Sequence, residues 1–574
     1  MGRIRIGLTI SGAVSLGSFE GGALAALLTG VQALQSAKPG VEPDLRVDAM
    51  GAASAGAITA VATARVLTAG VDPVWVMQQA WVKADSLEAL LKNAGVDAPL
   101  SMKGLAQLAN GILSPDPAHI DPRKVQMTDV LIDLALTNLR GLDYQIGRIQ
   151  ESSMGRGPLE ASTYLDWGRF TFKPNADVSS FTSPSEKCAV DTGLASGANE
   201  FGFPPKRLAR AASDYRDLEL INFPAGADPG FFWYTDGGTI NNEPLGRTLS
   251  VTNEIDLANP PDTGDHRVHV LIHPFPTAPP PATDRAWANG ANQPTWLRTL
   301  LRAMTIIRAQ SLFDDMRQAE KTNSRLIWKN RLIAALGDLI DNDLSAEQKR
   351  LWGEKLKAVV DGIEDDLKAL PRHKRDLTTD LDKTAPEESV ADYLEAAIDR
   401  VSDLAGRNAV GIEVVSPYLA QGTQGLSLDQ ILAGEFLEAF GGFFHEGLRR
   451  SDFALGFVCM LNWMENALPA YGLASAQYEI VLDAALRAFY ALDKWTENGQ
   501  TKSFTGYGLT ETLLKRAAAL GLDGGASWSI TYFGEMTLGR LPFRERLMFA
   551  QVAGRIGAVV THDMWLKAAK EDSP

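Results

Sequence analysis

Apolar runs alternate with helix-forming stretches through the first third of the chain. The alternation predicts strands over residues 5–10 and 45–50 and helices over residues 18–35 and 55–68. In the first run the period-two pattern of a strand is weakened by additional apolar residues, which is typical of a fully buried strand. Strands that alternate with helices form parallel sheets covered by helices. The pattern therefore predicts an α/β fold with a mostly parallel central sheet.

The middle of the chain has a less regular pattern. Residues 145–190 predict irregular structure with short strands, such as one at residues 169–172. Residues 267–272 predict a further strand. A loop rich in proline and alanine separates it from a long helix predicted near residues 296–322.

Residues 331–409 are predicted to form an inserted helical subdomain. Apolar residues recur three and four positions apart within residues 352–370, which is the pattern of an amphipathic helix. Ser345 and Gln348 fit a capping box at the start of this helix, and residues 373–388 are charged enough to predict a solvated loop. The apolar face either packs against the body of the protein, which we favour, or docks on lipid as a lid.

The last segment, residues 457–574, predicts helices with glycine-containing joints. It contains no catalytic constellation. A modest basic patch from Arg540 to Arg546, with Arg555 beyond it, is interpreted as ordinary surface charge, with contact to a partner or a lipid headgroup as the weaker alternative.

Composition and charge narrow the class of protein. The chain has 574 residues and 45% hydrophobic content, so it has ample core for more than one domain. Its net charge of −15 lacks the basic footprint that nucleic acid requires, and it argues against steady attraction to anionic membranes. The sequence contains no uninterrupted apolar run of about 18 residues, the length that spans a bilayer.

The first residues and the cysteines bear on location. Residues 1–5 lead straight into the first predicted strand, without the apolar stretch of a cleavable signal peptide. Cys188 and Cys459 are far apart and lack metal-ligand spacing, so they are interpreted as thiols in a reducing compartment. We therefore expect a cytoplasmic protein without a metal site.

A serine lies at the junction of the second predicted strand and the second predicted helix. Ser54 stands in the sequence MGAASAGA, residues 50–57. Tiny residues flank it, as the sharp strand–turn–helix of a nucleophile elbow requires. The N–H groups at the start of the following helix face the serine oxygen, where negative charge develops during acyl transfer. Ser54 is therefore a candidate nucleophile, the alternative being a helix start rich in small residues.

The first predicted strand ends in a loop of small residues, SGAVSLGS, at residues 11–18. Such a loop exposes backbone N–H groups, which an oxyanion hole requires. A phosphate-binding P-loop would need a lysine directly after Gly17, and a dinucleotide fingerprint would need a glycine in place of Val14. Both nucleotide interpretations are therefore disfavoured.

A third segment, YTDGGTINNEP at residues 234–244, contains a candidate base. Asp236 lies between an aromatic stretch and two glycines. A carboxylate within hydrogen-bond reach of a serine can accept its proton. An ordinary Asp-Gly turn has the same local sequence, so Asp236 is a candidate because the other two segments accompany it.

Together the three segments resemble the patatin-like phospholipase family, whose members hydrolyse acyl esters with a Ser–Asp dyad and no histidine. The family's glycine-rich oxyanion motif falls on residues 12–17, its Gly-x-Ser-x-Gly on residues 52–56, and its Asp-Gly-Gly, followed by Asn-x-Pro, on residues 236–244. The resemblance implies Ser54 as nucleophile and Asp236 as base. It assigns the oxyanion donors to Gly12, Ala13, Val14 and Ala55, and supporting motif positions to Gly17, Gly56, Gly237 and Gly238.

The resemblance also implies a fold and a domain organisation. The fold is a patatin-like three-layer sandwich with a mostly parallel central sheet and added helical regions. Further segments resemble the family in the same order: residues 134–139, 195–205, 306–326 and 449–456. They imply a catalytic domain over residues 1–330 that is completed by about 410–456, an inserted helical subdomain at 331–409 and a C-terminal helical region at 457–574.

Four residues depart from the family pattern. Ala13 and Val14 replace glycines of the oxyanion motif, Leu16 replaces a basic residue and Ala52 replaces the first glycine of the nucleophile motif. A backbone N–H donates whatever the side chain, provided that a non-glycine residue reaches the required backbone angles. The departures predict either a slow enzyme or a subfamily with a different loop shape.

A Ser–His–Asp triad is the other arrangement to consider. The chain has seven histidines: His119, His266, His269, His273, His373, His445 and His562. Those at 266–273 surround one predicted strand, where a structural histidine is favoured over a base. Triads are recognised by geometry and not by order, so His273 stays an alternative, and the dyad is preferred because a motif surrounds Asp236.

The sequence therefore predicts a serine acyl hydrolase of the phospholipase A or lysophospholipase type, acting in lipid degradation. It predicts no cofactor, a lipid ester as substrate with transient membrane contact, and no nucleic-acid partner, and it leaves the oligomeric state open. Two alternatives remain. One is a patatin-fold regulatory or interaction protein with little catalysis, and the other is an acyltransferase that uses the same acyl-enzyme.

Overall fold

The structure is a computed structural model of the whole chain. It describes residues 2–83, 90–91, 98–150, 158–200, 202–215, 221–223, 228–276, 296–369, 390–402, 410–435, 439–492, 495–497, 500–502 and 508–522. The predicted loop at 373–388 and the basic patch at 540–546 lie outside these residues.

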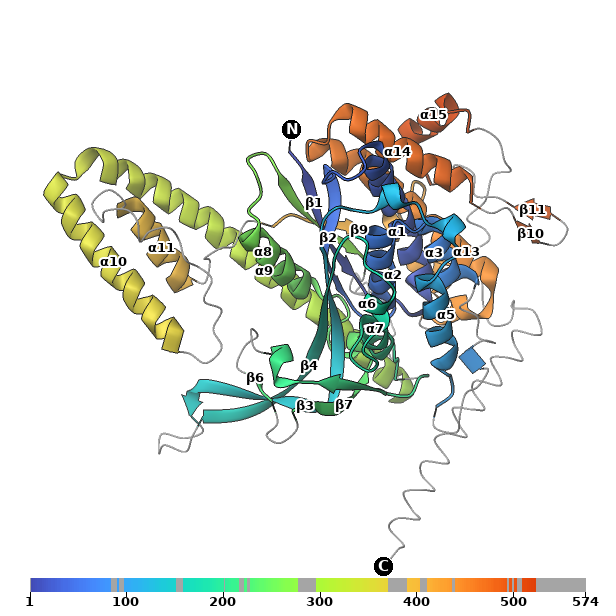
Figure 1. Cartoon of the computed structure of the whole chain (residues 1–574), viewed down its shortest axis with the longest axis horizontal. Coiled ribbons are helices and arrows are strands. Elements are labelled where there is room, and N and C mark those ends of the chain that lie inside the picture. Colours follow the sequence, from blue (N-terminus) through green and yellow to red (C-terminus); the bar gives the residue numbers. More distant parts are fainter. Residues whose placement is uncertain are drawn as a thin grey trace, which may run out of the picture.

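A nine-stranded mixed sheet forms the centre of the molecule (Figure 1). Its strands are β1 (Ile4–Ile10), β2 (Leu45–Ala52), β3 (Val130–Gln150), β4 (Pro158–Phe172), β5 (Lys206–Arg210), β6 (Ile221–Asn222), β7 (Gly230–Thr235), β8 (His266–Ile272) and β9 (Ile412–Val415). Along the main path the order is β5-β7-β3-β2-β1-β8-β9, and β4 and β6 pair with β3.

One part of the sheet is parallel and the other antiparallel. The neighbours β3-β2-β1-β8-β9 are parallel, whereas β4, β6 and β7 run antiparallel to β3, and β5 runs antiparallel to β7. Every residue of β1 and β2 is buried, since these strands lie in the middle of the sheet with helices on both faces. The predicted α/β fold with a largely parallel sheet is confirmed.

Helices cover both faces of the sheet (Figure 1). On one face lie α1 (Gly17–Ala37), α2 (Ala55–Ala69), α3 (Pro73–Gln78), α7 (Ala189–Ser196) and α13 (Glu446–Ala470), and on the other α8 (Leu245–Ala258) and the first part of α9 (Trp296–Asp343). The remaining elements are α5 (Lys103–Leu113), α6 (Ser179–Thr182), α10 (Ala346–Ala369), α11 (Val390–Ser402), α12 (Leu428–Ile431), α14 (Ser475–Tyr490), α15 (Glu511–Ala519) and a small hairpin of β10 (Trp495–Glu497) and β11 (Gln500–Lys502).

Glycines allow the closest contact between helices. A Cβ atom on Gly22 of α1 would lie 1.8 Å from the carbonyl oxygen of Phe453, and one on Gly456 of α13 would lie 1.9 Å from that of Phe19. No side chain fits at either position, so the backbones of α1 and α13 touch directly. This contact places the late segment of the chain beside the loop that follows β1.

The first four predicted elements are confirmed as β1, α1, β2 and α2, with boundaries shifted by at most two residues. The expectation of irregular structure over residues 145–190 is wrong for its first part, because β3 and β4 form a long antiparallel hairpin there. The helix predicted near 296–322 is longer and continues to Asp343. At the start of α10 the predicted capping box is confirmed, with Ser345 and Gln348 each donating a backbone N–H to the other's side chain.

Among the described residues, one stretch is long and apolar enough to cross a membrane. It comprises Val14–Ala37, and 89% of its most apolar window is buried inside the protein. Because α1 packs against both α13 and α14, this burial is that of a core helix.

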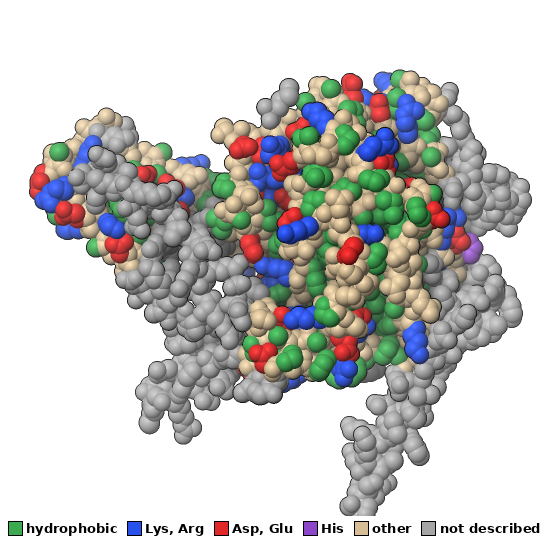
Figure 2. Space-filling view, viewed as in Figure 1, with side chains coloured by type: hydrophobic (Ala, Val, Ile, Leu, Met, Phe, Trp, Pro, Cys, Tyr) green, Lys and Arg blue, Asp and Glu red, His purple; other side chains and the backbone are tan. Residues whose placement is uncertain are grey.

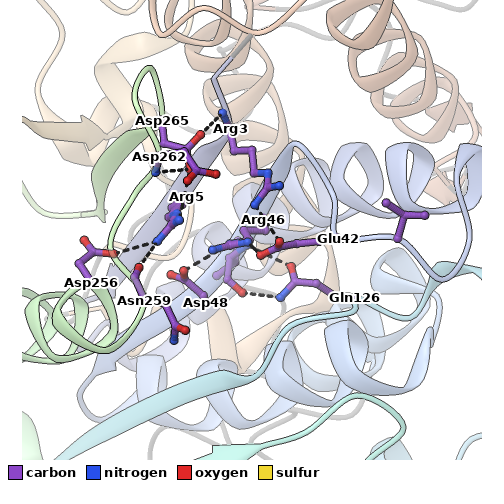
Figure 3. A network of polar contacts seen from close by, with 12 residues as sticks. Arg3, Arg5, Glu42, Arg46, Asp48, Gln126, Asp256, Asn259, Asp262 and Asp265 are labelled. Atoms are coloured by element: carbon purple, nitrogen blue, oxygen red, sulfur yellow. Dashed lines mark hydrogen bonds and ion pairs between the residues drawn. The ribbon is translucent and has the colours of Figure 1, made fainter.

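A network of buried charges closes the end of the sheet where β1, β2 and β8 begin (Figure 3). Arg5 donates to Asp265 at 3.2 Å, to Asp256 at 3.4 Å and to the carbonyl oxygen of Asn259 at 2.8 Å. Close by, Arg46 pairs with Asp48 and Glu42, and Arg267 with Asp48 and Asp256. Burial lowers the pKa of Arg46, whereas the pKa of Arg267 is raised despite burial because hydrogen bonds and charge from Asp256 and Asp48 favour the cation. Strands, connections and the N-terminus are thus tied together at the end opposite to Ser54.

Candidate active site

Ser54 is the residue directly before α2, in the sharp turn that follows β2. Its backbone angles are φ 53° and ψ −125°, a conformation that costs a non-glycine residue roughly 1–3 kcal/mol. The N–H of Ser54 donates to the hydroxyl of Ser196 at 2.9 Å. A Cβ atom on Gly56 would lie 2.5 Å from the carbonyl oxygen of Ile10, so the turn is pressed against the end of β1. The small residues around Ser54 are therefore a steric requirement.

The hydroxyl of Ser54 donates to the carboxylate of Asp236, with 3.1 Å between Oγ and Oδ2. Asp236 directly follows β7, and 182 positions separate it from the serine in the chain. Both side chains are almost fully buried, with Ser54 5% and Asp236 1% exposed. The structure brings together the two residues that the sequence singled out.

The carboxylate of Asp236 has two further donors. The side-chain amide of Asn199 donates to Oδ2 at 3.1 Å, and the N–H of Gly238 donates to Oδ1 at 2.8 Å. The Thr137 hydroxyl donates to the backbone carbonyl of Asp236 at 2.7 Å. The carboxylate therefore accepts from the Ser54 hydroxyl, the Asn199 amide and the Gly238 N–H, and three donors fit an ionised carboxylate. Together they leave Asp236 little freedom to rotate away from Ser54.

Sequence reasoning missed two of these supporting residues. Ser196 accepts from the Ser54 N–H and donates to the carbonyl oxygen of Ala135 at 2.7 Å. Asn199 donates to Asp236. Both belong to the segment at 195–205 that resembles the family, and their polar side chains in an otherwise small and apolar run (ASGAN) were the signal that could have identified them.

The supporting motif glycines are all in crowded positions. A Cβ atom would lie within 2.5 Å of another atom at each of Gly17, Gly56, Gly237 and Gly238. Gly12 is equally constrained, since its Cβ would lie 2.2 Å from the Asn242 side-chain oxygen and 2.9 Å from Cβ of Ser54. The loop after β1 therefore passes directly beside the serine.

The assignment of Gly12 as an oxyanion donor needs correction. Its N–H already donates to the carbonyl oxygen of Asn242 at 2.8 Å, and the Asn242 side chain donates back to the Gly12 carbonyl oxygen at 3.0 Å. Asn242, the first residue of the predicted Asn-x-Pro, thus joins the loop after β1 to the loop after β7. The other expected donors, Ala13, Val14 and Ala55, have no acceptor for their N–H groups among the described residues.

Val14, in the loop after β1, has a left-handed backbone conformation. Its φ is 51°, which is a genuine outlier for a β-branched residue. Its side chain packs on a buried apolar cluster that includes Phe443 and Leu100, with Phe203 and Phe440 also packed against it. The Val14 side chain therefore links the loop after β1 to this apolar cluster.

The segment at 449–456 holds the outer side of the same loop. Arg449 of α13 donates to the Gly442 carbonyl oxygen at 2.8 Å, and the Gly442 N–H donates to the Ser15 hydroxyl at 3.0 Å. Asp452 accepts the N–H groups of Ala433 and Gly434 at 2.7 and 2.9 Å. Leu16, at the position of the family's basic residue, is fully buried under these contacts. The loop after β1 is therefore held from α13, through contacts with Ala433, Gly434 and Gly442.

A buried carboxyl group lies behind the loop. Glu20 of α1 is fully buried, and burial raises its pKa well above the usual range. The Ser11 hydroxyl lies 3.3 Å from Glu20 Oε1 and 2.9 Å from the carbonyl oxygen of Ile272. The Ser11 hydroxyl has one proton, which it donates to the carbonyl oxygen of Ile272. A protonated Glu20 then donates its own proton to the Ser11 oxygen.

His269, in the middle of β8, and His273, directly after this strand, are buried. His269 makes a contact of 2.9 Å with the Thr252 hydroxyl, and His273 lies 3.7 Å from Glu243. Burial lowers the pKa of each to about 4. Among the described residues the hydrogen bond of the Ser54 hydroxyl goes to Asp236 and not to either histidine. The geometry is that of a dyad.

These histidines predict sensitivity to mild acid. Folding lowers the pKa of His273 from 6.5 to about 4. Between these pH values the imidazole is neutral in the folded protein and protonated in the unfolded chain. Its contribution to stability is therefore complete above about pH 6.5 and is lost as the pH falls toward 4. At pH 4 the loss for one histidine amounts to about 3 kcal/mol. We expect His273→Gln to unfold with a shallower dependence on pH between 6.5 and 4 than the wild type, measured by urea denaturation. Parallel curves for the two proteins would contradict this expectation.

Within the described part of the chain no three His, Cys, Asp or Glu residues are grouped to hold a metal ion.

No protein-family model matches the chain. It is 27% identical over 407 residues to an uncharacterized protein, y4iI, of Sinorhizobium fredii (strain NBRC 101917 / NGR234). That match covers 56% of each protein, so the chain spans about half the length of the curated relative it matches.

Proposed function

We propose that this protein is a patatin-like serine acyl hydrolase that cleaves fatty-acyl esters of phospholipids or lysophospholipids. The observation that carries the proposal is the 3.1 Å hydrogen bond from Ser54 to Asp236, made from a strained turn between a buried strand and a helix. Strain of this kind persists only where the surrounding structure imposes it, and it gathers at active sites. The strained conformation supports a hydrolase over a non-catalytic protein of the same fold.

The chemistry follows from the positions of these groups. Asp236 accepts the Ser54 proton while Oγ bonds to the ester carbonyl carbon. The N–H groups of Ala13, Val14 and Ala55, for which the described residues offer no acceptor, stabilise the negative oxygen that forms. The alcohol leaves with the proton from Asp236. A water molecule, activated by the same carboxylate, then releases the fatty acid from Ser54.

The surroundings of the dyad support an acyl chain as the group recognised. Val14 belongs to the oxyanion loop and packs on the apolar cluster of Leu100 and Phe443. Phe203, four residues beyond the Asp236 partner Asn199, packs on the same cluster. An apolar chain bonded to the reacting carbonyl gains contact there. We therefore propose a long-chain ester as substrate and a reducing, cytoplasmic setting, where the buried free cysteines Cys188 and Cys459 remain thiols.

A fluorophosphonate probe tests the nucleophile directly. It is expected to label the folded wild-type protein once, at Ser54, and not to label Ser54→Ala. Fatty-acid release is then measured from phosphatidylcholine, lysophosphatidylcholine and p-nitrophenyl esters of short and long chain. We expect release from long-chain substrates that is lost in Ser54→Ala. Absence of both labelling and release would reject the hydrolase, whereas labelling with transfer only to an added alcohol would favour the acyltransferase.

A further inference from the structure

A helical arm extends from the body of the protein (Figure 1). It consists of the second half of α9 together with α10 and α11. Lys329 of α9 pairs with Glu395 and Asp399 of α11, both at 2.9 Å, while Val360 of α10 packs on Tyr393 in a small core of its own. The first half of α9 stays on the body, where Asp315 accepts the Gly246 N–H of α8 at 2.8 Å. One side of α9 is therefore packed along its length.

The other side of α9 carries a strip of cations around exposed apolar side chains. Spaced three and four positions apart, and so on one face of the helix, lie the exposed residues Phe313, Arg317, Lys321, Arg325, Trp328, Arg331 and Leu332. Trp328 is 65% exposed, Phe313 57% and Leu332 46%. We refer to these seven residues as the basic strip.

The charge of the basic strip is not neutralised within the described part of the chain. No salt bridge there involves Arg317, Lys321, Arg325 or Arg331, whereas the neighbouring Lys329, on the packed side, has two carboxylate partners. Asp314 and Asp315 follow Phe313 at the start of the strip, and from Arg317 to Leu332 the one acidic residue in the sequence is Glu320. The chain has a net charge of −15, so this run of cations is a positively charged segment in an acidic protein. On the face of the arm that Figure 2 shows, basic and acidic side chains are interspersed.

We propose that the basic strip docks on an anionic phospholipid surface. Cations attract the negative headgroups, and an exposed tryptophan with leucine and phenylalanine beside it suits the boundary between headgroups and acyl chains. Long arginine side chains can keep their charged ends at the headgroups while their stems and Trp328 enter the interface. A nucleic acid would use the cations but would leave the apolar side chains of the strip in water, so the lipid surface fits the whole strip better.

The proposal differs from one expectation from composition and goes beyond the proposed hydrolysis. Net charge argued against attraction to anionic membranes, but attraction falls off within a Debye length of about 8–10 Å, so a local strip acts independently of distant carboxylates. The strip shares no residue with the dyad. Docking can therefore be measured with Ser54→Ala, and its failure would leave the proposed hydrolysis untouched.

Vesicle co-sedimentation of full-length Ser54→Ala tests the proposal. We expect binding to vesicles of phosphatidylcholine mixed with phosphatidylglycerol, weakening in high salt, and little binding to phosphatidylcholine alone. Adding Arg325→Gln and Arg331→Gln should lower the partition coefficient about 30-fold, at the usual contribution of each cation near an anionic surface, and Trp328→Ala should lower it as well.

The matched control removes two exposed cations that already have carboxylate partners, with Arg123→Gln and Lys515→Gln. It should bind like the parent protein. Equal binding to charged and neutral vesicles, or an equal loss in the control and the strip variants, would overturn the proposal. So would displacement from vesicles by a duplex oligonucleotide at a concentration equal to that of the charged lipid, which would assign the strip to another polyanion.

Discussion

Asp236→Asn is expected to lower the rate of ester hydrolysis by about 1,000-fold or more. The amide has nearly the shape of the carboxylate but cannot take the Ser54 proton, and general-base catalysis contributes roughly 10²–10⁴-fold in enzymes. In the proposed mechanism Asp236 has a second task, because it also activates the water that attacks the acyl-enzyme. Release of fatty acid under saturating substrate measures the combined loss.

A matched variant separates this loss from a general effect of charge. Asp143→Asn makes the same change on β3, at a side chain that is 54% exposed and pairs only loosely with Arg140 at 3.7 Å. It should leave the rate unchanged. Asp236→Asn should keep the thermal midpoint within a few degrees, since Asn199 and Gly238 remain near it. A folded Asp236→Asn protein that hydrolyses esters as fast as Asp143→Asn would refute the role of the base.

The hydrogen-bonded pair of Ser54 and Asp236 could be predicted from sequence because local geometry leaves few alternatives there. A serine between Ala53 and Ala55 at a strand–helix junction has to occupy a tight turn, and the Asp-Gly-Gly after an aromatic strand has to form another. The residues that support the pair, Ser196 beside Ser54 and Asn199 beside Asp236, could not be predicted in the same way. Their polar side chains stand out in an apolar run, but their contacts are decided only where β3 and β7 bring the end of α7 and the residues after it against Ser54.

The errors in the fold prediction also have identifiable causes. The β3–β4 hairpin was missed because its period-two pattern is interrupted: the register shifts between Thr137 and Leu142, and Gly141 adopts φ 79°. Gly12 was expected to donate to substrate, but its N–H is used by Asn242 from the loop after β7. The first error therefore comes from an interrupted local pattern, and the second from a contact between distant segments that no local pattern encodes.

The buried network in Figure 3 was missed for a related reason. Arg5 alone in an apolar strand suggests a side chain that reaches water. Its partners Asp256 and Asp265 come from the region around α8 and β8, more than 250 positions later. Only the parallel pairing of β1 with β8 brings them to the same end of the sheet.

Arg5→Met is expected to destabilise the protein by about 3–5 kcal/mol, the usual cost of removing one partner from a buried ion pair. Arg5 is 3% exposed and Asp256 9%, so the carboxylates and the Asn259 carbonyl oxygen that Arg5 contacts would stay buried without its donors. Arg5→Lys keeps the charge but cannot reach all three acceptors at once, so it should fall between methionine and the wild type. The free energy of unfolding in urea measures the series.

The control for this series is Arg123→Met, which removes the same guanidinium from Asp121 at a site where the arginine side chain is 72% exposed. It should leave the unfolding midpoint unchanged, because water and salt already screen that pair. If Arg5→Met unfolded at the same urea concentration as Arg123→Met, the network would not hold the base of the sheet. A large difference would show that β1, which positions the loop beside Ser54 at its other end, is anchored by charges that the loop itself never contacts.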